Sequence, residues 1–239
     1  MKNLLNPISN VGIHTLGIEL FPDAEKVFSR DVEKHAEFLN PLLLIELSLI
    51  NPKWQGSVPL LSPIEPTIEG FLGDGGDHST HNYYLGINTI CLKADDNWRF
   101  ELMGDFAYFE KEHVPNSKEN NENYAREQAS YEKKKALFRA GETLYNFSTP
   151  LFVEGGEPLF NKFGGEANIG NWTNDIHLPL NQEPYSHSDE MIYPLAEDGN
   201  RFYFIASVSG YYFRDSGADE ILLFYEPVNK IILLTFDWS

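Results

Sequence analysis

The sequence predicts an α+β fold, mostly antiparallel β-sheet with two main amphipathic helices, in one globular domain over residues 1–239. Two segments have the hydrophobic period of a helix, and residues 201–239 contain three aromatic-rich strand segments joined by turn sequences. The 42% hydrophobic and 14% aromatic content supplies the apolar surface that offsets the entropy of folding. We expect residues 150–239 to be the strand-rich part of this domain.

Two segments are expected to be helical. The first covers residues 22–39, where apolar side chains recur at spacings of three and four and Pro22 suits the first turn. We place His35 on its polar or boundary face. The second covers residues 117–140 and is expected to end at Gly141. Its apolar side chains recur every seven residues, at Tyr124, Tyr131 and Phe138.

The segments between these helices are mixed. Residues 42–50 are an apolar run that fits a buried strand or a short helix. Residues 51–77 are rich in Pro and Gly, which predicts a long loop. Residues 81–92 and 98–110 are apolar segments separated by the turn sequence KADDN, and we expect them to form a hairpin.

The C-terminal segment is the most strand-like part of the chain. Residues 201–213, 220–227 and 230–239 are rich in Phe, Tyr, Ile and Leu, and the sequence EPVNK predicts a reversal between the last two. Their near-continuous apolarity predicts strands that are covered on both faces.

Residues 153–168 contain two Gly-Gly pairs, which raises the question of a phosphate-binding loop. Each pair is followed by a glutamate, Glu157 or Glu166, and a carboxylate there would repel a bound anion. A phosphate loop also leads into a helix and usually contains a lysine. We therefore expect both Gly-Gly pairs to form tight turns.

The chain is acidic, with 18 basic and 36 acidic residues and a net charge of −18. Residues 140–239 contain four Lys or Arg and fifteen Asp or Glu residues. Nucleic acid and anionic membranes would be repelled, whereas a basic protein partner or a cation would be attracted. The alternative is that the charge serves solubility alone.

Cys91 is the only cysteine and lies in an apolar run, which predicts a buried thiol without a disulfide. No segment approaches the roughly 20 apolar residues of a membrane-spanning helix, and the N-terminal residues lack the apolar core of a signal peptide. We expect a cytoplasmic protein.

Residues 73–81, GDGGDHSTH, form the sharpest cluster of candidate ligands. Two carboxylates and two imidazoles on a glycine-rich backbone suit a divalent metal, and such a site could serve a metal-dependent hydrolase. A glycine-rich surface loop with Asx turns explains the same residues. The candidate metal ligands are Asp74, Asp77, His78 and His81.

A second polar set, His177, His187, Asp189 and Glu190, suits general acid-base chemistry but fits a polar linker between strands better. A third set contains aromatic and acidic side chains that suit a carbohydrate or peptide contact, or else a strand end followed by a turn. Its members are Trp172, Tyr211, Tyr212, Asp215 and Asp219.

Three C-terminal segments resemble the YwqG-like bacterial proteins of unknown function. They are FGGEANIGNW at 163–172, EDGNRFYFIASV at 197–208 and GADEILLFYEP at 217–227. The resemblance implies antiparallel sheets with peripheral helices and no assigned catalytic residues, and it suits an immunity or adaptor role. We expect an acidic interaction module that contacts a basic partner, with a metal-dependent hydrolase and a carbohydrate-binding module as alternatives.

Overall fold

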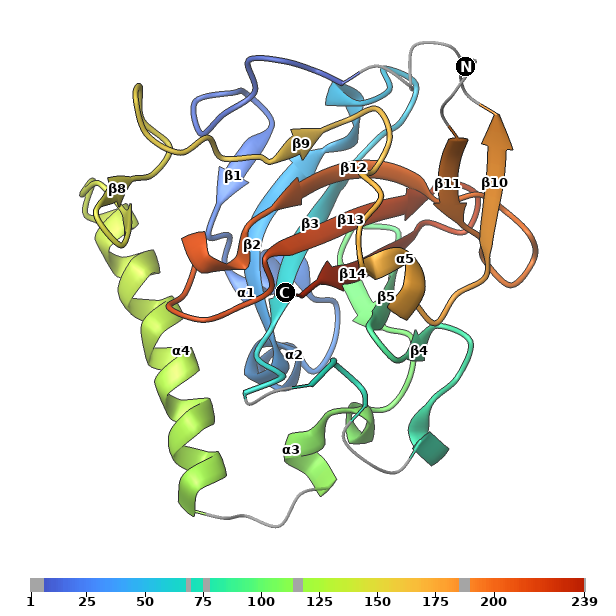
Figure 1. The fold of residues 1–239 in the computed structure, drawn as a ribbon, viewed down its shortest axis with the longest axis horizontal. Helices are drawn as coiled ribbons and strands as arrows, with labels where there is room; N and C mark the ends of the chain where they lie inside the picture. Colours follow the sequence, from blue (N-terminus) through green and yellow to red (C-terminus); the bar gives the residue numbers. More distant parts are fainter. Residues whose placement is uncertain (1–6, 68–69, 75–77, 114–117, 185–189, 239) are drawn as a thin grey trace.

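The protein is described here by a computed structural model, which places residues 7–67, 70–74, 78–113, 118–184 and 190–238. It has the expected α+β fold: two antiparallel sheets packed against each other, with helices at their margins (Figure 1). No helix among the described residues is long and apolar enough to cross a membrane.

The N-terminal sheet has three antiparallel strands in the order β1, β2, β3. They are Ile18–Leu20, Leu39–Glu46 and Ser57–Pro63. The apolar run at 42–50 is therefore strand β2 followed by a 3₁₀ turn at Leu47–Leu49.

Strand β3 corrects the expectation of a long loop over residues 51–77. Pro59 and Pro63 lie in this strand, opposite Leu44 and Leu39 of β2. Proline lacks an N–H donor and is tolerated in an edge strand, where one side of the backbone needs no partner. β3 is such an edge, so its prolines do not prevent pairing.

The helix expected over residues 22–39 is instead two short helices, α1 (Ala24–Val27) and α2 (Val32–Phe38). Between them Phe28 forms a bridge with Phe100, and Asp31 has a positive φ of 42°. The backbone of this segment pairs with a distant strand, and this tertiary contact overrides the local helical period.

The second sheet has seven strands, and every pairing within it is antiparallel. The order is β4, β5, β14, β13, β12, β9, with β6 beside β5. The strands are β4 (Leu85–Gly86), β5 (Thr89–Ala94), β6 (Phe100–Leu102), β9 (Lys162–Phe163), β12 (Tyr203–Val208), β13 (Glu220–Glu226) and β14 (Ile231–Asp237).

The expected C-terminal strands are confirmed, and both faces of this sheet are buried. Along β13, Ile221 and Leu223 face the larger core, which also contains residues of the N-terminal sheet, while Leu222 and Phe224 face a smaller core. This alternation is the period of two expected of a strand. The hairpin between residues 81 and 110 is confirmed by the β5–β6 pairing.

The strand expected to continue to residue 110 ends at Leu102. Residues Phe106–Tyr108 form a 3₁₀ turn, and Glu110–His113 form α3. The helix expected at 117–140 is confirmed as α4 (Lys118–Arg139), and Gly141 follows its end with φ +77°.

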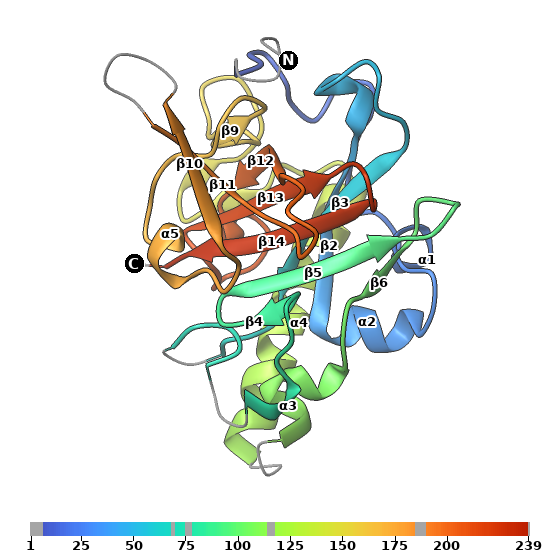
Figure 2. The same cartoon turned by 90° about the vertical axis from the view of Figure 1, so that its right-hand side faces the viewer.

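The smaller core lies under α5 (Trp172–Asp175) and a hairpin of β10 (Leu180–Pro184) and β11 (Glu190–Pro194). Figure 2 shows this hairpin crossing in front of β12, β13 and β14. The segment expected to be a polar linker therefore contains two strands, and His187 and Asp189 lie outside the described residues. A further two-stranded ribbon joins β7 (Tyr145–Asn146) and β8 (Thr149–Pro150).

Candidate functional site

The C-terminal hundred residues contain four Lys or Arg residues. Each of these side chains contacts a group other than the carboxylates of the same segment. Lys162 donates to the Asn168 side chain, and Lys230 pairs with Asp96 at 3.7 Å. The Arg201 guanidinium lies over the rings of Tyr193 and Tyr203, at 4.0 and 4.9 Å. Arg214 is buried, with 1% of its surface exposed. The carboxylates of this segment therefore gain little compensation from its own cations.

Arg214 belongs to a buried polar contact between helix α4 and the loop after β12. Its guanidinium donates to the carbonyl of Ile64 at 3.1 Å, and burial lowers its pKa to about 10. Lys134 of α4 donates to the carbonyls of Tyr211 and Arg214, and burial lowers its pKa. Ser216 donates to Glu127, also on α4. The inner face of α4 thus contains buried polar side chains beside the predicted stripe of Tyr124, Tyr131 and Phe138.

Asp175 and Asp219 each lie close enough to Asp237, at the C-terminal end of β14, for their charges to act on it, and we call these three residues the α5 acidic cluster. The pKa of Asp237 is raised, first by burial and then by the charges of the other two carboxylates. Backbone N–H groups of Asn171 and Trp238 oppose this shift. The cluster is one place where this segment concentrates negative charge.

Two of the three aromatic rings in the candidate carbohydrate contact are buried, although we expected them at the surface. Trp172 is 1% exposed and Tyr212 is 7% exposed, and both pack in the cores. The indole N–H of Trp172 is satisfied by the carbonyl of Asn168 at 2.7 Å. Tyr211 is half-buried and Asp215 is exposed, so the surface part of this set is small.

The candidate metal loop brings three histidines together. His78 begins the 3₁₀ turn His78–Thr80 and His81 directly follows it, and their stacked rings have centroids 4.5 Å apart. The ring of His177 lies 6.2 Å from that of His81, although it comes from the segment after α5. Burial and the neighbouring imidazoles lower the pKa of His81. Asp74 is exposed, and Asp77 lies outside the described residues.

The ring planes decide what the two stacked histidines can bind. A metal ion lies in the plane of each imidazole that binds it, because the nitrogen lone pair lies in that plane. The planes of His78 and His81 are within 12° of parallel, so their lone pairs do not meet at one point. Among the described residues, no three His, Cys, Asp or Glu side chains are placed to hold a metal. Metal binding here stays a prediction that requires one ring to rotate.

Both Gly-Gly pairs form turns, as expected. The N–H of Gly156 donates to the carbonyl of Val153, and the N–H of Phe152 donates to the carbonyl of Glu157. Gly164 and Gly165 have φ of 64° and 78°, which favours glycine, and they follow strand β9. Neither pair leads directly into a helix, so the phosphate interpretation has no structural basis in the described residues.

His35 is 1% exposed, which corrects its placement on a polar helix face. Its Nε2 accepts the backbone N–H of Leu102 at 3.0 Å, and its ring stacks on Phe28 at 4.8 Å. Burial lowers its pKa, so the neutral ring is favoured. Cys91 is buried as expected, and burial raises the pKa of its thiol. Both are structural residues.

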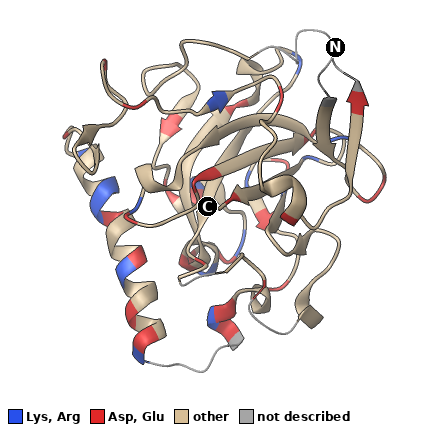
Figure 3. Cartoon of the chain, in the orientation of Figure 1, with Lys and Arg blue, Asp and Glu red and all other residues tan. Residues whose placement is uncertain are grey.

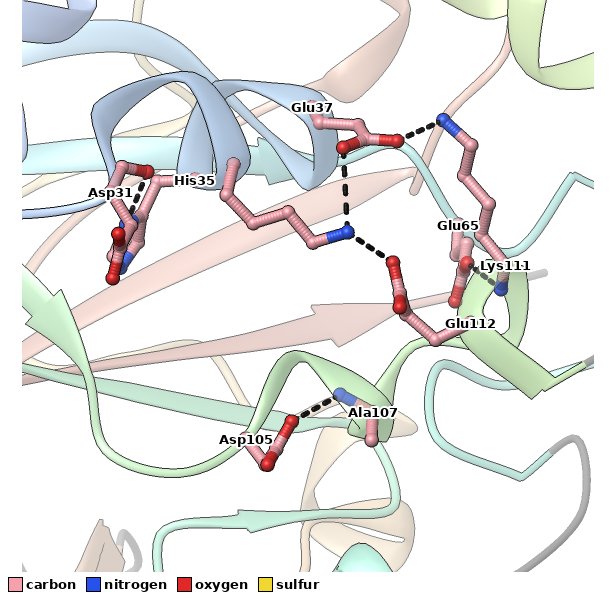
Figure 4. A network of polar contacts seen from close by, with 9 residues as sticks. Asp31, His35, Glu37, Glu65, Asp105, Ala107, Lys111 and Glu112 are labelled. Atoms are coloured by element: carbon pink, nitrogen blue, oxygen red, sulfur yellow. Dashed lines mark hydrogen bonds and ion pairs between the residues drawn. The ribbon is translucent and has the colours of Figure 1, made fainter.

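An ionic network that the sequence did not predict lies where α2 meets α3 (Figure 4). Glu37 binds the ammonium groups of Lys34 and Lys111, at 3.6 and 2.7 Å, and Lys34 also binds Glu112. Lys34 and Glu37 are three residues apart on α2, but Lys111 and Glu112 come from a distant segment, so local spacing alone did not indicate the network. Beside it, α2 and α4 line an open pocket of about 550 Å³.

Comparisons of the chain with protein-family models, with curated proteins and with solved structures found no match.

Proposed function

We propose that the protein is an acidic interaction module that contacts a basic protein partner through its C-terminal hundred residues. The observation that supports this proposal is the engagement of all four basic side chains of this segment. Arg214 is buried, Arg201 lies over two aromatic rings, Lys162 binds an amide and Lys230 binds Asp96. A segment rich in carboxylates, whose own cations are engaged elsewhere, attracts a basic surface and steers its approach.

The α5 acidic cluster is the part of this segment that we assign to the contact. Asp175 and Asp219 are half-buried, and burial together with their charges raises the pKa of Asp237. A basic side chain placed beside them would relieve this repulsion. Helix α4 differs from this segment, because it has both basic and acidic positions along its length (Figure 3). The resemblance to YwqG-like proteins adds support for an immunity or adaptor type of module.

The proposal is tested with an oligolysine peptide as the probe. We expect the Asp175→Asn/Asp219→Asn variant to bind it more weakly than the wild type, and added salt to weaken wild-type binding. The matched control is Glu25→Gln/Glu119→Gln, which changes the net charge equally at two exposed helical positions. Equal losses of affinity in both variants would mean that net charge alone causes the binding. A wild-type affinity that does not change with added salt would overturn the proposal.

A further inference from the structure

The pocket between α2 and α4 has the size of a small-molecule site. Its volume is about 550 Å³, within the range of roughly 300–1,000 Å³ that is typical of ligand pockets. Ala36, Ile64, Ala125 and Tyr124 supply its apolar lining. Its polar lining consists of Glu33, Glu37, Lys111, Asn121 and Gln128.

The charges of the lining favour a cation. Lys111 is neutralised by Glu37, at 2.7 Å between Nζ and Oε1. Glu33 is exposed, and the ion pairs of the described residues do not include it. Glu33 is therefore the charge in the lining that its neighbours leave uncompensated, and it would pair with a positively charged ligand.

Gln128 adds a second acceptor that needs a donor. Its Oε1 is buried and has no hydrogen-bond partner among the described residues. The orientation of the amide is fixed because Nε2 donates to the carboxylate of Glu132 at 3.3 Å, where an amide oxygen would be repelled. A buried acceptor without a donor is costly, and a ligand N–H would satisfy it.

The pocket already shows how an ammonium group is held there. The Nζ of Lys111 lies 5.3 Å from the centre of the Tyr124 ring and 5.7 Å from that of Phe38, while Glu37 binds it directly. An aromatic face together with a carboxylate stabilises an organic cation. Figure 4 shows Lys111 extending from α3 toward Glu37 of α2.

We propose that this pocket binds a small organic cation, an alkylammonium compound whose apolar body lies against Ala36, Ile64 and Ala125. Its N–H groups donate to Glu33 and to the Oε1 of Gln128. This site is separate from the α5 acidic cluster and does not depend on the function proposed for that cluster.

The test uses n-pentylamine as the probe and pentanoate as a control of the same length and opposite charge. We expect pentylamine to shift the amide NMR signals of Glu33, Lys111 and Gln128 in a saturable way, and pentanoate to leave them unchanged. Saturable shifts from pentanoate of equal size, or shifts from pentylamine that never saturate, would overturn the proposal.

Two variants with matched controls separate the pocket from the overall charge. Glu33→Gln should weaken pentylamine binding by roughly tenfold, because it removes a charged acceptor. Glu25→Gln, the same change at an exposed position of α1, should not weaken pentylamine binding to a comparable extent. Gln128→Leu should also weaken binding, whereas Gln55→Leu should not. Equal affinities for Glu33→Gln and Glu25→Gln would show that the amine responds only to net charge, against the proposal.

Discussion

The hydroxyl of Tyr124 on α4 donates a 2.8 Å hydrogen bond to the carboxylate of Glu65, which follows strand β3. Glu65 is 1% exposed and also accepts the backbone N–H groups of Glu110 and Lys111, both at 2.9 Å. One buried carboxylate thus joins the N-terminal sheet, α3 and α4. Burial raises its pKa, and these hydrogen bonds oppose the shift.

Removing the Tyr124 hydroxyl should destabilise the protein. We expect Tyr124→Phe to lower the free energy of unfolding by about 1–3 kcal/mol, because it removes a donor from a buried carboxylate. Urea unfolding measures the change. The control is Tyr145→Phe, at a residue that is 54% exposed, and we expect it to have little effect. Equal effects of the two changes would contradict the role given to the Tyr124 hydroxyl.

The Arg214 side chain should help to hold the loop after β12 against the segment that follows β3. Arg214→Ala removes a buried guanidinium that bonds the carbonyl of Ile64, and we expect a loss of about 3 kcal/mol. Arg214→Met keeps part of the packing and should cost less. Arg30→Ala, at a side chain that is 76% exposed, is the control for removal of an arginine. A loss no larger than that of Arg30→Ala would argue against a structural role.

His35 should make stability depend on pH. The folded protein lowers the pKa of His35, so the unfolded chain binds the proton more readily. Stability is therefore full above the ordinary histidine pKa of about 6.5 and falls as the pH decreases below it. Urea unfolding near neutral pH and near pH ~5 measures this loss.

The variant His35→Gln should be less stable at neutral pH and should lose less stability on acidification than the wild type. Its control is His14→Gln, at an exposed histidine, which should keep the wild-type dependence. An unchanged pH dependence in His35→Gln would assign the effect to another group.

The elements that the sequence predicted well are those whose partners are local or whose burial is complete. Helix α4 was found from the seven-residue spacing of Tyr124, Tyr131 and Phe138, and the C-terminal strands from their continuous apolarity. Strand β3 was missed because proline argues against a strand, and only its edge position makes Pro59 acceptable.

The site was harder to predict, because its parts meet only in the fold. His177 approaches His81 from a distant segment, and the pocket takes Glu33 from α2 and Gln128 from α4. The prediction that Trp172 and Tyr212 are exposed was wrong for a related reason. An aromatic residue near a turn has the same local sequence whether it faces solvent or, like Trp172, a core.

Two glycines that share a positive φ differ in what a side chain at their position would contact. Gly56 and Gly199 have almost equal φ, +80° and +81°. A Cβ on Gly56 would lie 1.9 Å from Cδ2 of Trp98, whereas a Cβ on Gly199 would meet no described atom within 4 Å. We expect Gly199→Ala to cost about 1 kcal/mol and Gly56→Ala to cost clearly more. Thermal unfolding compares them, and equal losses would mean that Trp98 moves aside freely.

The histidine cluster yields a prediction about metal. Because the rings of His78 and His81 are stacked, we expect protein that is incubated with zinc and then desalted to retain less than stoichiometric zinc. Elemental mass spectrometry measures the content, with a chelator-treated sample as the blank. Stoichiometric zinc that is lost in Asp77→Ala/His78→Ala but kept in His14→Ala would contradict this expectation. That result would mean that a ring rotates to complete a site with Asp77, and hydrolase assays would then test the metal-dependent alternative.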